Sequence, residues 1–298
     1  MGSPHSLRAM RKTLIVASVA AALIGGTATA GAINTYNSQP APERTEVGAY
    51  VALWDSDDDG IPDRFDWVCS GAMIDDDTFL TAAHCTTDWP DGTRHFVSLL
   101  QDLQARLDAA TGTASQMMAQ LLADGSVVEG DPFWDAAFPG NGSDAQDIGV
   151  LDFEDRAVTP ADVWTFTPAQ LPTAHQLDLA GSRTLDQAAW TVVGYGTSEA
   201  ERGPGGHTHL NGGVRLKADE GFNALNKTWV RLAMNESRGF GGACYGDSGG
   251  PNFVVLGGQR LLASTTITGD VPCYATNVSY RTDSPSARAF LADYVALP

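Results

Sequence analysis

Short apolar runs separated by turn-forming residues dominate the chain and predict β-strands. The runs are four to eight residues long and are bounded by Gly, Pro, Asp or Ser clusters. This spacing is typical of all-β barrels or sandwiches, in which short strands follow one another through tight turns. The predicted strands are Ala49–Trp54, Trp67–Ile74, Ile148–Phe153, Trp190–Gly194, Thr228–Leu232, Phe253–Leu256 and Leu261–Ile267.

Two segments show helical rather than alternating spacing. Leucine and methionine side chains recur three and four positions apart across residues 98–123, which predicts a helical insertion there. Near the end of the chain, Ser284 is a suitable N-cap and Pro285 suits a first helical position, so a C-terminal helix is expected. The glycine-rich segment Gly203–Gly213 has the composition of an exposed loop.

The first thirty-two residues have the features of an export signal. Three basic residues precede an apolar run of 13 residues, Leu14–Gly26, and small residues up to Ala32 offer two cleavage sites. The run is too short to span a bilayer, and no later apolar stretch reaches about 18 residues. The sequence therefore predicts a signal peptide over residues 1–32 and a secreted protein, with a short membrane anchor as the alternative.

Composition narrows the classes of partner. The chain has 298 residues, 43% of them hydrophobic, and 36 acidic side chains against 18 basic ones give a net charge of −18. Such an acidic surface repels phosphate backbones and anionic lipids, so neither nucleic acid nor a membrane surface is an expected partner. Four cysteines in an exported protein imply two disulfides, which the count alone can pair in three ways.

Three motifs carry the candidate chemistry: TAAHC at residues 81–85, DIGVL at residues 147–151 and GDSGGP at residues 246–251. Attack on an amide needs a nucleophile, a base for its proton, a group that orients the base, and donors for the developing oxyanion. Serine, histidine and a buried carboxylate can supply the first three roles. Glycines beside the serine permit a tight turn with exposed N–H groups.

In these motifs, their order and the WTVVGYG segment at residues 190–196, the chain resembles the trypsin/chymotrypsin-like serine peptidases, and actinobacterial-type secreted members in particular. The resemblance covers residues 33–298. It implies an all-β fold of two antiparallel six-stranded β-barrels, at residues 33–165 and 166–298, with the C-terminal helix closing the second unit. It also implies a polypeptide substrate, and we expect a monomer.

The resemblance assigns roles to individual residues. His84 is expected to be the general base, Asp147 to orient it and Ser248 to be the nucleophile. The N–H groups of Gly246 and Ser248 are expected to form the oxyanion hole. The resemblance further implies the disulfide pairs Cys69–Cys85 and Cys244–Cys273.

Relatives commonly pair a freed N-terminal isoleucine with the acid that precedes the catalytic serine. Asp247 occupies that position, and signal peptidase cleavage after Ala32 would release Ile33 as the N-terminus. We therefore expect an Ile33–Asp247 pair formed on export.

The substrate pocket departs from the trypsin pattern. Gly242 stands where tryptic members carry an aspartate, so a neutral, small-to-medium apolar side chain is expected in the pocket. Gly269 is expected to line one wall and Val278 to narrow the base. Ile267 stands where relatives have a serine that contacts the triad aspartate, which leaves Thr266 or backbone N–H groups to satisfy that carboxylate.

An acidic loop at residues 55–66 matches the D-x-D-x-D-G calcium pattern. Positions 1, 3, 5, 9 and 12 of the loop are aspartates and position 6 is Gly60. It resembles thrombospondin type 3 calcium repeats, and a solvated acidic hairpin tip is the alternative interpretation. A structural Ca²⁺ is expected, with no cofactor for catalysis, and the ligands would be Asp55, Asp57, Asp59, Asp63, Asp66 and the Ile61 carbonyl.

The expected function is that of a secreted serine endopeptidase acting through an acyl-enzyme. A G-x-S-x-G elbow of α/β-hydrolases is excluded, because its histidine follows the serine and all six histidines here precede Ser248. The alternatives are a catalytically weak, calcium-stabilised binding protein on the same scaffold and a secreted esterase.

Overall fold

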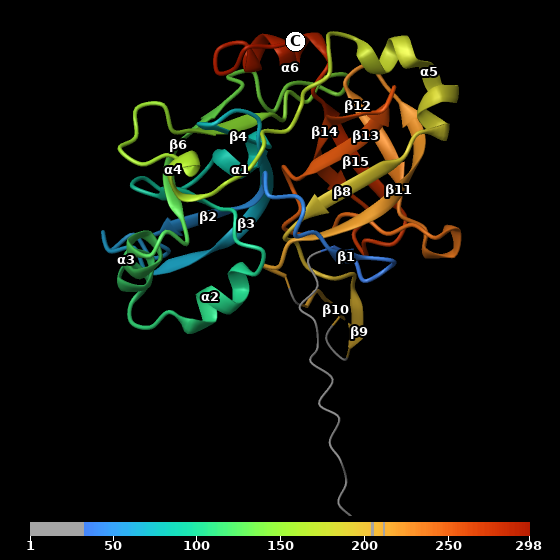
Figure 1. Ribbon diagram of the computed structural model, residues 1–298. Coiled ribbons are helices and arrows are strands. Elements are labelled where there is room, and N and C mark those ends of the chain that lie inside the picture. Colours follow the sequence, from blue (N-terminus) through green and yellow to red (C-terminus); the bar gives the residue numbers. More distant parts are fainter. Residues whose placement is uncertain (1–32, 204–205, 211) are drawn as a thin grey trace, which may run out of the picture.

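Two closed antiparallel β-barrels of six strands each form the fold, as the resemblance implied (Figure 1). The computed structural model describes residues 33–203, 206–210 and 212–298. The predicted signal peptide, residues 1–32, lies outside the described residues. Across the described ranges, no helix is long and apolar enough to cross a membrane.

The first barrel buries most side chains of its strands, and β2 and β4 are buried along nearly their whole length. Large apolar residues such as Tyr50, Phe79 and Phe153 are fully buried there, and each contributes roughly 1.5–3 kcal/mol on leaving water. In barrel order the strands are β2 (Val47–Trp54), β3 (Arg64–Met73), β4 (Thr78–Thr81), β7 (Gly149–Asp152), β6 (Val128–Trp134) and β5 (Arg94–Ser98), with β5 pairing back to β2.

The second barrel closes through the pairing of β11 with β8. Its strands in order are β11 (Leu216–Leu225), β12 (Trp229–Ala233), β15 (Thr276–Arg281), β14 (Gln259–Gly269), β13 (Pro251–Leu256) and β8 (Trp190–Gly194). A short strand from the start of the described chain, β1 (Gln39–Pro40), pairs with β11. The segment that begins at Ile33 therefore lies against the second barrel, although the predicted boundary grouped it with the first.

The predicted helical insertion is confirmed and forms two helices. They are α2 (Leu103–Ala109), capped by Asp102, and α3 (Ala114–Ala123), which starts at a capping box formed by Thr113 and Gln116. The C-terminal helix α6 (Pro285–Leu291) begins as predicted, with the Ser284 side chain accepting the Ala287 N–H. The other helical segments are α1 (Ala83–Thr86), α4 (Pro160–Val163), α5 (Gln176–Gln187) and the 3₁₀ turn Glu236–Arg238.

Several strands were not predicted from the apolar pattern, because they bury polar side chains. β11 and β15 carry buried Glu220, Asn277 and Ser279 at inward positions, where an apolar residue would have given the strand signal. β4, β5 and β6 were also not predicted. The glycine-rich segment, expected as a loop, contributes to a small hairpin of β9 (Glu201–Gly203) and β10 (Gly206–Thr208).

A buried arginine ties the two barrels together and so fixes the site between them. The Arg215 guanidinium donates to the carbonyl oxygens of Ala41, Val47 and Leu99 and to the Tyr195 hydroxyl. Three carbonyl oxygens from residues 41–99 and one hydroxyl from the second barrel thus surround a single side chain that is 3% exposed. Buried charges of this kind need a full set of hydrogen bonds to be tolerated.

Candidate active site

The histidine motif forms a short helix directly after a strand of the first barrel. Thr81 ends β4, and His84 lies in α1, which the Cys69–Cys85 disulfide joins to β3. The disulfide closes a loop of 16 residues, which in the chain-entropy treatment contributes about 3 kcal/mol to stability. The imidazole is therefore held on a short, cross-linked segment.

One carboxylate binds both the ring and the main chain of His84. Asp147 Oδ2 lies 2.8 Å from His84 Nδ1, and Asp147 Oδ1 accepts the His84 backbone N–H at 3.0 Å. Asp147 is 7% exposed and immediately precedes Ile148 and β7. Backbone N–H donation was one of the two expected ways to satisfy this carboxylate. The other expected donor, the Thr266 hydroxyl, accepts from Asn252 and makes no hydrogen bond to Asp147 within the described ranges.

This contact selects the tautomer of the imidazole. When Nδ1 carries the proton that Asp147 accepts, Nε2 is left with a lone pair that can receive a proton. The His84 side chain remains 33% exposed, so Nε2 chemistry is open to an incoming molecule.

The serine motif of the second barrel packs against the segment that leads into His84. The Ser248 carbonyl accepts the Ser70 N–H at 2.8 Å, and Gly249 N–H donates to Thr266 O. Gly249 has a φ of +76°, and a Cβ there would lie 2.8 Å from the Ala82 nitrogen, so only glycine fits. The structure thus brings the serine turn against the histidine segment, which the Asp147 carboxylate contacts.

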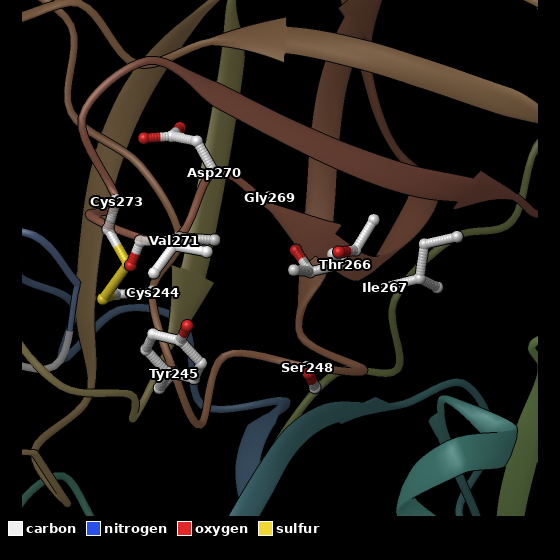
Figure 2. Close-up of a pocket in the computed structure, with 11 residues that line it drawn as sticks. Cys244, Tyr245, Ser248, Thr266, Ile267, Gly269, Asp270, Val271 and Cys273 are labelled. Atoms are coloured by element: carbon white, nitrogen blue, oxygen red, sulfur yellow. A yellow bond between two sulfur atoms is a disulfide. The ribbon is translucent and has the colours of Figure 1, made fainter.

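The Ser248 hydroxyl has no hydrogen-bond partner among the residues that the structure describes. A serine–histidine hydrogen bond is commonly long in a free enzyme and tightens only when substrate is bound. The hydroxyl borders an open cavity, as Figure 2 shows, and is therefore free to meet a ligand.

Two backbone donors lie beside this hydroxyl. Within the described ranges, neither the Gly246 N–H nor the Ser248 N–H donates to another protein group. Gly246 has a φ of +91°, and a Cβ at this position would lie 2.3 Å from the Trp67 indole. Trp67 and the Ser70 hydroxyl, which donates to Gly246 O, hold this turn from the first barrel. Two free N–H groups next to a nucleophile are the donors that an oxyanion requires.

Ile33 and Asp247 are both fully buried behind the serine turn. Ile33 packs with Val192, Leu216, Ala218 and Ala243, and the following Asn34 exchanges hydrogen bonds with Gly242. The Asp247 carboxylate accepts the N–H groups of Gly196 and Cys244.

No cationic side chain of the described residues bonds to the Asp247 carboxylate. Burial raises the pKa of Asp247 to about 8, which the two backbone hydrogen bonds only partly offset.

A cavity of about 230 Å³ opens beside Ser248 and is the natural seat for a substrate side chain (Figure 2). Its walls come from the segment around the Cys244–Cys273 disulfide and from the end of β14. Of the residues expected at the pocket, Gly269 lines the cavity, while Gly242 and Val278 are not among its lining residues. The lining residues are Ala243, Cys244, Tyr245, Ser248, Thr266, Ile267, Thr268, Gly269, Asp270, Val271 and Cys273.

Asp270 is an acidic wall residue that sequence reasoning missed. Its carboxylate accepts the backbone N–H groups of Tyr274, Ala275 and Thr276, so it shapes the loop that carries Cys273. Ser70 and Trp67, which support the serine turn, were also missed. Both residues lie within two positions of Cys69, the predicted disulfide partner of Cys85. This proximity was the sequence signal that could have placed them near the site.

The acidic loop gathers three of the five aspartates that were expected to be calcium ligands. Carboxylate oxygens of Asp55, Asp57 and Asp59 lie within 4.8 Å of one another. The charge of Asp59 raises the pKa of Asp57, as expected for close like charges. Asp63 instead accepts from Ser56, and Asp66 accepts the Trp67 N–H. Neither of the last two belongs to the cluster, and the Ile61 side chain is exposed.

Comparison with known proteins adds an independent observation. The family model described as Trypsin matches residues 51–280, a range that contains the histidine, aspartate and serine motifs and most strands of both barrels. A search of curated proteins found no match to the chain.

Proposed function

This chain belongs to the trypsin family, and on that premise we propose that it is an exported serine endopeptidase that acts through a Ser248–His84–Asp147 triad. The family supports a hydrolase of the serine peptidase type with polypeptide substrates. The observation that carries the finer proposal is the double contact of Asp147 with the ring and the main chain of His84. This contact leaves Nε2 free to act as a base, and the serine turn packs against the segment that leads into His84.

The proposed reaction has two stages. His84 Nε2 takes the proton of Ser248 Oγ as Oγ attacks the substrate carbonyl carbon, and the resulting oxyanion accepts from the N–H groups of Gly246 and Ser248. The intermediate collapses as His84 returns the proton to the leaving amine, so that the C–N bond breaks and an acyl-enzyme remains. Water, deprotonated by His84, then cleaves the ester and restores the Ser248 hydroxyl.

A labelling experiment tests this proposal. We expect a fluorophosphonate to modify the native protein once, at Ser248, because only an activated serine reacts at neutral pH. Heat-denatured protein is the control and should remain unlabelled. A library of peptides and matched esters distinguishes the alternatives, since hydrolysis of esters alone would indicate an esterase. No label and no turnover of any substrate would contradict enzymatic activity altogether.

We place the protein outside the cell. Disulfides persist in oxidising compartments, and both pairs, Cys69–Cys85 and Cys244–Cys273, are formed. The predicted signal peptide supports the same location.

We further propose that the cluster of Asp55, Asp57 and Asp59 binds a structural Ca²⁺. Saturating Ca²⁺ at about 100 times its Kd should stabilise the fold by about 2.7 kcal/mol. For a chain of this size, that corresponds to a rise in Tm of roughly 5–10 °C, measured by calorimetry in CaCl₂ against EDTA. The physical reason is that Ca²⁺ removes the repulsion among the close carboxylates. Because Ca²⁺ binds only the folded loop, its binding stabilises the folded state.

Two variants control this measurement. Asp57→Asn should abolish the Ca²⁺ response, whereas Asp76→Asn, which removes an acidic charge outside the cluster, should keep it. An equal Tm in CaCl₂ and EDTA for the unaltered chain would refute the calcium proposal.

A further inference from the structure

Three polar side chains from different strands of the second barrel form a buried group behind the substrate cavity. Glu220 on β11, Asn252 on β13 and Asn277 on β15 are all 3% exposed or less. Asn277 Nδ2 donates to Glu220 Oε1 at 3.0 Å and to Asn252 Oδ1 at 2.8 Å. Asn252 Nδ2 in turn donates to the hydroxyl of Thr266, a cavity wall residue, at 3.1 Å. A chain of hydrogen bonds therefore connects Glu220 to the cavity.

Two acceptor atoms in this group lack a donor. Glu220 Oε2 and Asn277 Oδ1 are buried, and neither has a hydrogen-bond partner among the described residues. An unpaired buried acceptor costs about 1–3 kcal/mol, and more when the group is charged. The proposed triad reaction uses neither atom. It therefore does not explain why these two buried acceptors have no donor.

Glu220 also lacks a counter-charge. Burial, and to a smaller extent the neighbouring charge of Asp247, raise the pKa of Glu220 to about 8, while the Asn277 hydrogen bond and the Ala243 N–H act in the opposite direction. No salt bridge to Glu220 forms within the described part of the chain. A cation brought close to Glu220 would favour the ionised carboxylate and offset its burial.

The position of Glu220 next to Gly242 indicates that such a cation would approach from the substrate cavity. A Cβ at Gly242 would lie 2.8 Å from Glu220 Oε1 and 2.2 Å from Met234 Cγ. Glu220 and Met234 thus occupy the space into which a residue-242 side chain would project. Ala243, the next residue, lines the cavity. The unbranched Met234 side chain can repack around a ligand.

The cavity wall itself favours positive charge. Asp270 lines it, and none of the described lining residues is basic. Asp270 is already satisfied by three backbone N–H groups, whereas Glu220 has a free oxygen, so Glu220 is the better acceptor for a new donor.

We propose that Glu220 makes this cavity select a cationic side chain, lysine or arginine, in the peptide residue whose carbonyl Ser248 attacks. The ammonium or guanidinium donates to Glu220 Oε2 and Asn277 Oδ1, directly or through one water, and so satisfies both orphan acceptors. This inference rests on the proposed endopeptidase function. It differs from the expectation of a neutral, small-to-medium apolar side chain, which started from Gly242.

The test is a series of fluorogenic peptides that differ only in the residue before the cleaved bond: Lys, Arg, Gln, Leu or Ala. A hydrogen bond to a charged group contributes about 1.5–3 kcal/mol, so the unaltered enzyme should favour Lys and Arg over Gln by roughly 10–100-fold in kcat/KM. In Glu220→Gln, which keeps the shape of the side chain, this ratio should fall to about one, because kcat/KM falls for the Lys and Arg peptides.

Matched variants identify the source of the preference. Asp219→Asn removes the adjacent carboxylate on β11, which is bonded to Thr191 rather than to the buried group, and should leave the ratio unchanged. Asp270→Asn should likewise retain most of it. Collapse of the ratio in Asp270→Asn with no change in Glu220→Gln would overturn the assignment.

A measurement on the unaltered protein removes any dependence on the folding of a variant. Benzamidine, a planar cation, should inhibit cleavage of the Ala peptide competitively and much more strongly than neutral benzamide. Equal inhibition, or a preference of the active enzyme for Leu over Lys and Arg, overturns this inference alone. Failure to cleave any peptide, together with no labelling of Ser248, overturns the proposed function as well.

Discussion

Replacing Ser248 with alanine should lower kcat/KM for peptide hydrolysis by about 10⁵–10⁶-fold, the size of loss seen when the nucleophile of a triad is removed. The variant lacks the hydroxyl that forms the acyl-enzyme, and residual turnover would come only from the oxyanion donors and substrate binding. Steady-state kinetics with a fluorogenic peptide, after removal of contaminating proteases, gives the ratio directly. Labelling by a fluorophosphonate should disappear in the same variant.

The variant should fold normally, because the contacts of residue 248 are made by its backbone. Its carbonyl accepts the Ser70 N–H, and its side chain bonds to no described residue. Ser115→Ala, the same change at an exposed position on α3, should retain full activity. If Ser248→Ala kept more than about a hundredth of the activity with an unchanged Tm, a different nucleophile would have to be sought.

A chain that starts at Ile33 should be about 10²–10³ times more active than one that starts at Ala32. Only the first places a free ammonium on Ile33, which lies buried behind the serine turn and can pair with Asp247. Asp247 adjoins Gly246 and Ser248, so an unpaired carboxylate should disturb the oxyanion donors, and loss of one such donor costs about this factor in kcat. Both chains can be prepared by cleavage of a fused carrier, and their kcat values compared.

The two chains should also differ in how stability depends on pH. With Ala32 retained, Asp247 has a folded-state pKa of about 8, raised above the value near 3.8 that it has when exposed. A raised pKa means that the folded state holds its proton more tightly, so this contribution is complete at low pH and is lost as pH rises from about 4 to 8. The chain that begins at Ile33 should not lose this stability, since its ammonium holds the Asp247 pKa down.

A double-mutant cycle separates the ion pair from other effects of chain length. In Asp247→Asn the ammonium has no carboxylate to pair with, so both starting points should give the same low activity. Equal activity of the two chains with Asp247 intact would refute the pairing. N-terminal sequencing of the secreted protein should show Ile33 first, and a start at Gly31 or Thr45 would count against activation by export.

Local signals were sufficient for features that depend on neighbouring residues. The closing helix was predicted from Ser284 and Pro285, because capping is a short-range interaction. The same holds for strands with continuous apolar runs, such as β8 and β13. The leucine and methionine spacing likewise predicted the helical insertion, which the caps at Asp102 and Thr113 divide into α2 and α3. The pattern failed for strands that bury polar residues, such as β11 and β15.

The sequence by itself determined which candidate chemical groups the chain carries: a histidine, an aspartate and a serine in motifs of high specificity, four cysteines, and an excess of acidic side chains. These are properties of residue type and spacing, which a linear pattern records in full.

Only the tertiary structure decided which acceptors are paired. It placed the His84 backbone N–H on Asp147, separated Asp63 and Asp66 from the cluster of Asp55, Asp57 and Asp59, and left Glu220 Oε2 without a donor. The physical reason is that hydrogen bonding and desolvation of a buried group depend on residues brought from distant strands. Glu220, Asn252 and Asn277 lie up to 57 positions apart, and a sequence pattern carries no signal for their contact.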